Sequence, residues 1–337
     1  MRAPLAMVFT LVSLIATGNP KIYLAGQYKH GRERTACYWV DGSRFDLSAG
    51  SSAARATSIY VFQGRVYVAG FYEKEKRTIA CYWIDGVRSD LPGGEEAGSI
   101  QDAWAFSISV SAGKVYVAGY STGHKSSACY WVDGVRNQLP GSSANSIYVL
   151  EGKVYVAGEN DGKACYWVNG ETRVLVAAQD VEAAAANAIA LSTGNVFIAG
   201  NYRIGKKWYA CYWLNGARTD LVVESRVSPS AVAVQRAATY ATSMWVCDGN
   251  IYIAGYYEDG VDARACYWIN GKRIDIRSSS TQEITLSSIF ALKNTFYIAG
   301  WIDWDQGYST DGCYWKDGTR IDLRQIGATV DAIFVVQ

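Results

Sequence analysis

Apolar residues recur along the chain in short runs that end in Ala-Gly. The seven runs span Ile22 to Gly26, Val66 to Gly70, Val115 to Gly119, Val154 to Gly158, Val196 to Gly200, Ile251 to Gly255 and Phe296 to Gly300. A variable segment and then Cys-Tyr-Trp follow each run, beginning at Cys37, Cys81, Cys129, Cys165, Cys211, Cys266 and Cys313. An Asp-Gly or Asn-Gly pair follows every copy. The chain therefore repeats one unit, with a period typical of propeller blades.

Each unit predicts four short strands. Residues 58–62 typify strand A, the apolar run is strand B, and Cys-Tyr-Trp begins strand C, because these segments are rich in β-branched and aromatic residues. The Asp-Gly pair is a strong signal for a tight hairpin turn. Strand D carries Arg-x-Asp-Leu, as in Arg44, Asp46 and Leu47. The sequence predicts an all-β fold, a seven-bladed β-propeller of four-stranded antiparallel blades.

Strands B and C are apolar on both faces, as expected for blades packed between two neighbours. In strand C the Cys and the Trp share one face and the Tyr points to the other. We therefore interpret Cys-Tyr-Trp as packing rather than chemistry. Equivalent cysteines on adjacent blades should lie about 10 Å apart, too far for a disulfide. The prediction is seven buried free thiols, with Cys247, in a strand A, as the one candidate exception.

The two ends of the chain decide how the ring closes. Residues 328–336 match strand A but no strand B follows, so we expect them to join residues 21–47 and complete the first blade. Residues 1–18 have two interpretations. Arg2 followed by an apolar core is typical of a signal peptide, which would leave residues 19–337 as a single propeller domain outside the cytoplasm. Alternatively, Leu11 to Ala16 form a first strand A, the C-terminal strand is surplus or begins a missing blade, and the protein is cytoplasmic. The segment is too short to predict a membrane span.

Charge and metal-ligand spacing exclude several functions. The chain has 32 basic and 31 acidic residues, which gives no electrostatic footprint for nucleic acid. Its two histidines, His30 and His124, lie apart, and no paired Cys or His spacing predicts a metal site. Asp303, Asp305 and Asp311 form a weak Ca²⁺ candidate, although Tyr314 stands where an acidic residue usually closes such a loop. We expect no other cofactor, and a monomer.

The chain contains 24 Tyr and 12 Trp, and the repeat accounts for only part of them. We expect long, variable B–C and D–A loops on one face, where binding residues often gather. The candidate ligand-binding residues in or beside the B–C loops are Trp301, Trp304, Trp208, Tyr209, Tyr257, Tyr72 and Tyr28. Such rings stack on sugars or anchor a protein partner. The alternative is that strand B continues past Ala-Gly and these rings pack between blades.

No nucleophile elbow, phosphate loop or Ser/Cys-His arrangement occurs in the sequence. The prediction is a non-catalytic scaffold that presents its B–C loops to a glycan or protein partner. The alternative is a propeller-fold hydrolase or lyase that uses loop carboxylates. Its candidate residues are Asp303, Asp305, Glu73, Glu75, Glu258 and Asp259.

The whole repeat, Tyr-Val-Ala-Gly, a variable loop, Ala-Cys-Tyr-Trp, Asp-Gly and Arg-x-Asp-Leu, covers residues 21–337. It resembles uncharacterised bacterial repeat proteins of secreted and lipoprotein type that look like β-propellers. The resemblance implies export and a propeller, and it brings no activity with it. A lipoprotein would need a Cys directly after the apolar segment, whereas the first is Cys37, inside a predicted blade.

Overall fold

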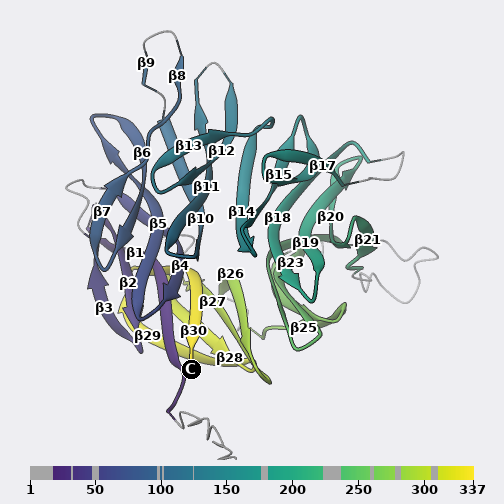
Figure 1. Cartoon of the computed structure of the whole chain (residues 1–337). Coiled ribbons are helices and arrows are strands. Elements are labelled where there is room, and N and C mark those ends of the chain that lie inside the picture. The colour runs from purple at the N-terminus through teal and green to yellow at the C-terminus, as the bar shows by residue number, and fades with distance from the viewer. Residues whose placement is uncertain are drawn as a thin grey trace, which may run out of the picture.

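The structure is a computed structural model that describes residues 18–31, 33–47, 53–96, 99–100, 102–123, 125–175, 181–222, 237–258, 262–277, 282–304 and 310–337. Its strands form seven four-stranded sheets and one small two-stranded sheet, β8 (Glu95–Glu96) with β9 (Ser99–Ile100). The seven sheets stand like blades around a central axis (Figure 1). The predicted seven-bladed propeller is therefore confirmed.

Each blade runs from strand A at the axis to strand D at the rim. The A strands of blades 1 to 7 are β30 (Ala328–Val336), β4 (Ala54–Phe62), β10 (Asp102–Ser111), β14 (Ser143–Leu150), β18 (Ala183–Ser192), β22 (Ala238–Cys247) and β26 (Glu283–Leu292). The B strands are β1 (Lys21–His30), β5 (Arg65–Lys74), β11 (Lys114–Thr122), β15 (Lys153–Asn160), β19 (Asn195–Ile204), β23 (Asn250–Glu258) and β27 (Thr295–Asp303). The C strands are β2 (Glu33–Val40), β6 (Arg77–Ile84), β12 (Ser126–Val132), β16 (Lys163–Val168), β20 (Lys207–Leu214), β24 (Ala263–Ile269) and β28 (Thr310–Lys316). The D strands are β3 (Ser43–Asp46), β7 (Val87–Asp90), β13 (Val135–Gln138), β17 (Glu171–Val174), β21 (Ala217–Asp220), β25 (Lys272–Asp275) and β29 (Thr319–Ile326).

The C-terminal strand closes the ring, as predicted. β30 pairs antiparallel with β1, from Lys21 opposite Val336 to Tyr28 opposite Ala328 (Figure 1). Residues 1–17, which hold most of the predicted signal segment and the alternative strand at Leu11 to Ala16, lie outside the described residues. The strand A position of blade 1 is occupied by β30. Within the described ranges, no helix has the length and hydrophobicity needed to cross a bilayer.

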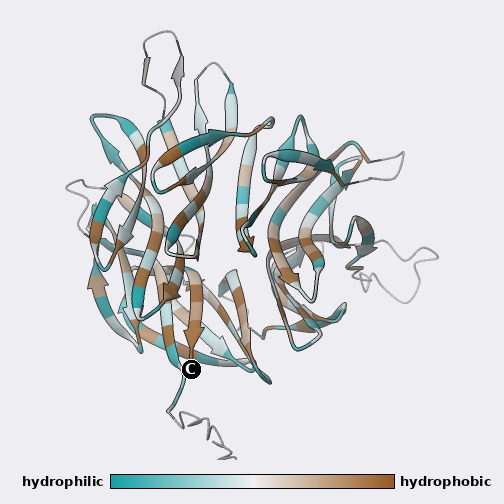
Figure 2. Ribbon diagram, in the orientation of Figure 1, coloured by the Kyte–Doolittle hydropathy of each residue, from teal (hydrophilic) through white to brown (hydrophobic). Residues whose placement is uncertain are grey.

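The Cys-Tyr-Trp repeat forms the core between blades. All seven of its cysteines are buried, and the Trp side chains are at most 2% exposed where their exposure is given. All eight cysteines are free, so the prediction of seven buried free thiols is confirmed, and Cys247 is free and partly exposed. Hydrophobic residues follow the strands through the body of the ring, while hydrophilic residues concentrate toward turns and hairpin ends (Figure 2).

The glycine that ends each Ala-Gly run is required by a close approach of strand A. A Cβ on Gly70 would lie 2.0 Å from the backbone oxygen of Arg55 and 3.0 Å from the ring of Trp83. A Cβ on the equivalent glycine would meet a strand A backbone oxygen at 1.9–2.1 Å in the other six blades as well. Because no side chain fits in that space, the repeat has glycine at this position.

The expectation of long B–C loops is wrong for most blades. Strands B and C continue well past Ala-Gly, so that Tyr72 lies opposite Ile79 in the ladder between β5 and β6. The hairpin ends in a two-residue turn at Glu75 and Lys76, whose φ angles of 52° and 64° are those of a tight turn. Neither residue is the Asn or Gly that usually marks such a turn, and the sequence pattern therefore missed it. The A–B and C–D turns are tight, as predicted.

Candidate functional site

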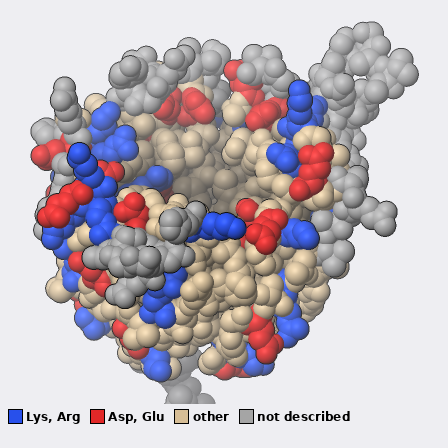
Figure 3. All heavy atoms as spheres, turned by 90° about the horizontal axis from the view of Figure 1, so that it is seen from above, with Lys and Arg blue, Asp and Glu red and all other residues tan. Residues whose placement is uncertain are grey.

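A cavity of about 390 Å³ lies on the propeller axis and is lined by residues from all seven A strands. The face that carries the B–C hairpins, here called the upper face, is hollowed at its centre, with charged side chains around the hollow (Figure 3). Ligand sites usually have volumes of about 300–1,000 Å³ and a few polar groups set among apolar ones. The axial cavity meets both criteria and brings together side chains from every blade.

Every A strand has a β-bulge at the same place, where its register with strand B shifts by one residue. The bulge residues are Thr57, Phe106, Asn145, Asn187, Thr242, Ser287 and Asp331, and all of them line the cavity. The next residue is a serine in five blades and an alanine in two, namely Ser58, Ser107, Ser146, Ala188, Ser243, Ser288 and Ala332. Because A strands run from the upper face to the A–B turns, the bulge residues stand above this second ring.

The bulge side chains connect neighbouring blades. Thr57 Oγ1 lies 2.7 Å from the Ala105 carbonyl oxygen of the next blade, and Asn145 Nδ2 donates to the Ala186 oxygen at 3.0 Å. Asn187, Thr242 and Ser287 make the equivalent bonds at 2.8, 3.1 and 2.6 Å. An inner strand has a free edge of backbone groups that needs partners. These residues therefore have a structural role in holding the ring together.

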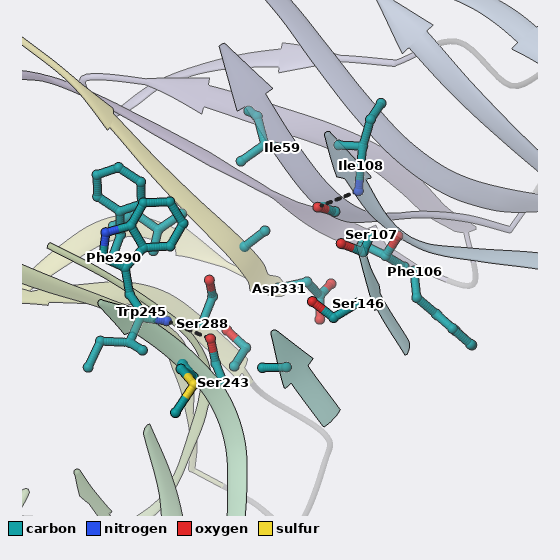
Figure 4. Close-up of a pocket in the computed structure, with 18 of the residues that line it drawn as sticks. Ile59, Phe106, Ser107, Ile108, Ser146, Ser243, Trp245, Ser288, Phe290 and Asp331 are labelled. Carbon is teal, nitrogen blue, oxygen red and sulfur yellow. Dashed lines mark hydrogen bonds between the residues drawn. The ribbon is translucent and has the colours of Figure 1, made fainter. Parts of the chain in front are cut away.

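The serine ring below them is different because it keeps donors for a ligand. Ser58 Oγ accepts the Ile108 N–H at 3.2 Å, and Ser107, Ser146 and Ser243 accept equivalent N–H groups at 3.1–3.2 Å. A hydroxyl that accepts one bond still has a proton to donate. Among the described residues these four serines donate to no acceptor. Four strands thus offer hydroxyl donors around one space, part of which is seen in Figure 4.

Asp331 is the one charged residue among the described residues that line the cavity. Its two carboxylate oxygens accept hydrogen bonds from Nη2 and Nε of Arg55, at 2.5 and 3.0 Å. The Asp331 side chain is 8% exposed and that of Arg55 is 40% exposed. Burial raises the pKa of the Asp331 carboxyl, and the hydrogen bonds from Arg55 oppose that shift. The pair connects β30 to β4 and places a carboxylate in the cavity wall.

An arc of aromatic rings lies below the serines. Trp245 packs against Phe290 with ring centroids 4.3 Å apart, Phe290 against Phe334 at 4.9 Å, and Phe334 against Tyr60 at 4.8 Å. These residues belong to four consecutive A strands, β22, β26, β30 and β4. Burial raises the pKa of Tyr60 and of Tyr148, so both phenols are neutral at physiological pH. The lower wall is therefore aromatic and uncharged.

Three predicted ligand-binding tyrosines lie in strand B rather than in loops. Tyr28, Tyr72 and Tyr257 each pack under the guanidinium of a strand D arginine, 4.1–4.4 Å from the ring centroid. The same arginines form ion pairs of 2.8–2.9 Å with the Asp of Arg-x-Asp. We call these groups Tyr–Arg–Asp stacks. The alternative interpretation, that strand B simply continues, is the correct one for their position.

The predicted tryptophans are also mostly in strands, far from the axial cavity. Trp208 and Tyr209 lie in β20, beside Arg203 and Tyr202, and Trp301 lies in β27. Trp304 is 43% exposed, and its Nε1 donates to Asp311 at 2.9 Å. None of the seven predicted binding residues lines the axial cavity.

The calcium candidate is only partly described. Asp303 lies in β27 and Asp311 in β28, but Asp305 lies outside the described residues. In the described part of the chain no three His, Cys, Asp or Glu residues form a group that could hold a metal ion.

The cavity residues lie in the A strands, whereas the predicted binding residues were expected in loops. One signal was present. When the strand A segments are aligned, Asp331 is the one acidic residue at the bulge position, and Trp245, Phe290 and Phe334 are the large apolar residues three positions further on. A comparison of how the repeats differ would have found them.

No family model and no curated protein matches the sequence. Among solved structures, the fold is similar to a Mycobacterium tuberculosis puromycin-hydrolyzing peptidase, with a TM-score of 0.56 and 12% identity. That match covers 90% of this chain and 53% of the other, so the chain spans about half the length of the peptidase. A putative 6-phosphogluconolactonase from Bacteroides uniformis matches over 95% of this chain and all of its own, with a TM-score of 0.48 and 12% identity. At 12% identity, the similarity to the peptidase concerns the fold alone.

Proposed function

We propose that the protein is a non-catalytic binding protein that holds a saccharide, free or at the end of a glycan, in the axial cavity. The observation that carries the proposal is the ring of serine hydroxyls above an aromatic arc. Sugars present hydroxyl groups at their edges and an apolar face of C–H groups. Hydroxyl donors and an aromatic wall match both features.

Hydrolysis is the alternative, and the cavity does not favour it. Most glycosidases use two carboxyl groups about 5–10 Å apart, one as acid and one as base or nucleophile. Of the described residues that line the cavity, only Asp331 has a carboxyl group, and both its oxygens accept from Arg55. Glu73 and Glu258 lie at the ends of strands β5 and β23, and Glu75 lies in the turn after β5, so all three carboxylates are away from the axis.

A glycan array followed by calorimetry tests the proposal. We expect the wild-type protein to bind at least one glycan, and Trp245→Leu to weaken that binding about tenfold, because a lost aromatic stack costs about 1 kcal/mol or more. Trp304→Leu is the matched control, since this exposed ring lies outside the cavity, and it should bind like wild type. Circular dichroism confirms that both variants fold.

Two results would contradict the proposal. One is a wild-type protein that binds no glycan. The other is release of product from chromogenic glycosides by wild type, which would establish the hydrolase instead.

A further inference from the structure

We infer that the axial cavity selects neutral and amino sugars over acidic sugars, and that the Asp331 carboxylate makes the selection. This inference rests on the proposed function, because it names the chemical class of the ligand. It begins from the orientation of the ion pair. Asp331 lines the cavity whereas Arg55 does not, so a ligand meets the carboxylate end of the pair.

Arg55 is directed at Asp331 and does not line the cavity. Its Nε and Nη2 groups both donate to Asp331. No Lys, Arg or His is found among the described residues that line the cavity. A ligand carboxylate would therefore lie against Asp331, the member of the ion pair that lines the cavity, and would meet no cation in the lining. Arg55 balances the charge of Asp331, but the nearer carboxylate contributes more to the field at the ligand, so the net effect is repulsive.

Hydrogen-bond chemistry also favours neutral and amino sugars over acidic ones. An ionised carboxylate only accepts hydrogen bonds, whereas a serine hydroxyl both donates and accepts. The serine ring therefore accommodates hydroxyl, ammonium and carboxylate groups alike. Asp331 pairs only with donors, which are the hydroxyl or ammonium groups of a neutral or amino sugar. The discrimination belongs to Asp331 and not to the serines.

The order of the blades around the axis shows which residues lie across the cavity from Asp331. In a seven-membered ring the A strand of blade 5, β18, stands opposite the junction between β30 and β4, where Asp331 meets Arg55. At the position directly after the bulge, where five A strands have serine, β18 has Ala188. Only Ala332 is equally small at this position. Asn187 therefore lies across the axis from Asp331 among the bulge residues, and Ala188, directly after it in β18, leaves more space below.

The test uses matched sugars and the wild-type protein, so that no variant needs to fold. Calorimetry measures binding of glucose, glucosamine and glucuronate, and of the corresponding galactose and mannose series. We expect the neutral and amino members of at least one series to bind at least tenfold more tightly than the acid. An acid that binds as tightly as its neutral partner overturns the inference but leaves the proposed function standing. Absence of binding by every member overturns both.

Two variants identify the residue responsible. Asp331→Asn combined with Arg55→Gln keeps a hydrogen-bonding pair without charge, and should reduce the discrimination to less than threefold. Asp85→Asn, at a C–D turn outside the cavity, should leave it unchanged. Unchanged discrimination in the double variant would contradict the role of Asp331. Ala188→Leu should abolish binding of all the sugars by filling the space at the level of the serines, whereas Ala217→Leu, on the exposed edge strand β21, should not.

Discussion

Each cysteine of the repeat lies directly opposite the Ala-Gly glycine of its own blade, as Cys81 does opposite Gly70 and Cys165 opposite Gly158. A small thiol and a glycine leave room for the neighbouring Trp ring, which packs within about 3 Å of the Cβ position at the glycine. The thiols are consequently shielded from water, and burial raises the pKa of Cys129, Cys165 and Cys313 to about 12. The cysteine is a packing residue, as the sequence analysis predicted.

Alkaline pH should therefore destabilise the fold. Below the ordinary thiol pKa of 9.0 both the folded and the unfolded chain keep their thiol protons. Above it the unfolded chain releases protons that the folded protein retains, so stability falls by about 1.4 kcal/mol per pH unit for each such thiol until the folded pKa is reached. Urea unfolding between pH 8 and 11 measures how the free energy of unfolding depends on pH. Cys165→Ala should make this slope shallower by the contribution of one thiol, about 1.4 kcal/mol per pH unit. An unchanged slope in that variant would show that this thiol titrates alike in both states.

At the scale of single strands, the residues at the three positions of the Tyr–Arg–Asp stack differ between blades. Blade 3 has Gln138 in place of the Asp, and its strand B carries Ser121 instead of the tyrosine; Arg136 donates to Ser121 Oγ at 3.0 Å. In blade 4, Thr172 and Val174 replace the Arg and the Asp, and Asn160 replaces the tyrosine. In blade 7 the Arg320–Asp322 ion pair is kept although Ile302 stands at the tyrosine position, so the ion pair does not require the ring.

Loss of one stack should have a measurable cost. Arg88→Met removes the contact with the Tyr72 ring at 4.1 Å and the ion pair with Asp90 at 2.9 Å. We expect the free energy of unfolding to fall by about 1 kcal/mol. Arg173→Met is the control, because its pair with Glu171 is exposed and its guanidinium stacks on no ring among the described residues, and it should change stability by less than about 0.5 kcal/mol. Equal losses in the two variants would show that the stack adds nothing.

The features that all seven units share could be predicted from the sequence, whereas the features that differ between units could not. Runs rich in β-branched and aromatic residues predicted strands A, B and C, and the Asp-Gly or Asn-Gly turns placed strand D after strand C. The B–C turn at Glu75 and Lys76 has no such signal, so Tyr72 was placed in a loop although it is 1% exposed. The cavity depends on single departures from the repeat, such as Asp331 and Ala188, and on strands that are far apart in sequence and meet only at the axis.

At the scale of the whole molecule, the ring is held closed by β30. This strand pairs with β1 and packs between β26 and β4, and its Asp331 binds Arg55. Blade 1 without it would expose the edge of β1 and leave the cavity open on one side. The closure was predicted from the unpaired strand A pattern at residues 328–336, and the structure confirms it.

Truncation tests the energetic importance of this closure. A chain that ends at residue 327 should lose cooperative thermal unfolding and aggregate, as followed by circular dichroism and size-exclusion chromatography. A peptide of residues 328–337 added in trans should restore the transition. Removal of residues 1–17 is the control and should leave the melting temperature unchanged, since blade 1 has four strands without them. A C-terminally truncated chain with wild-type stability would contradict the role of β30.

The pairing of β1 with β30 also sets an order of events during synthesis. Strand β1 is synthesised long before its partner strand, which begins only at Ala328. Throughout translation of the intervening blades the inner edge of β1 is a template for wrong pairing, with another chain or with a neighbouring unit of nearly equal sequence. Contacts of such long sequence separation form slowly. Yield in cells should consequently depend on chaperones that cover this edge until the ring is complete.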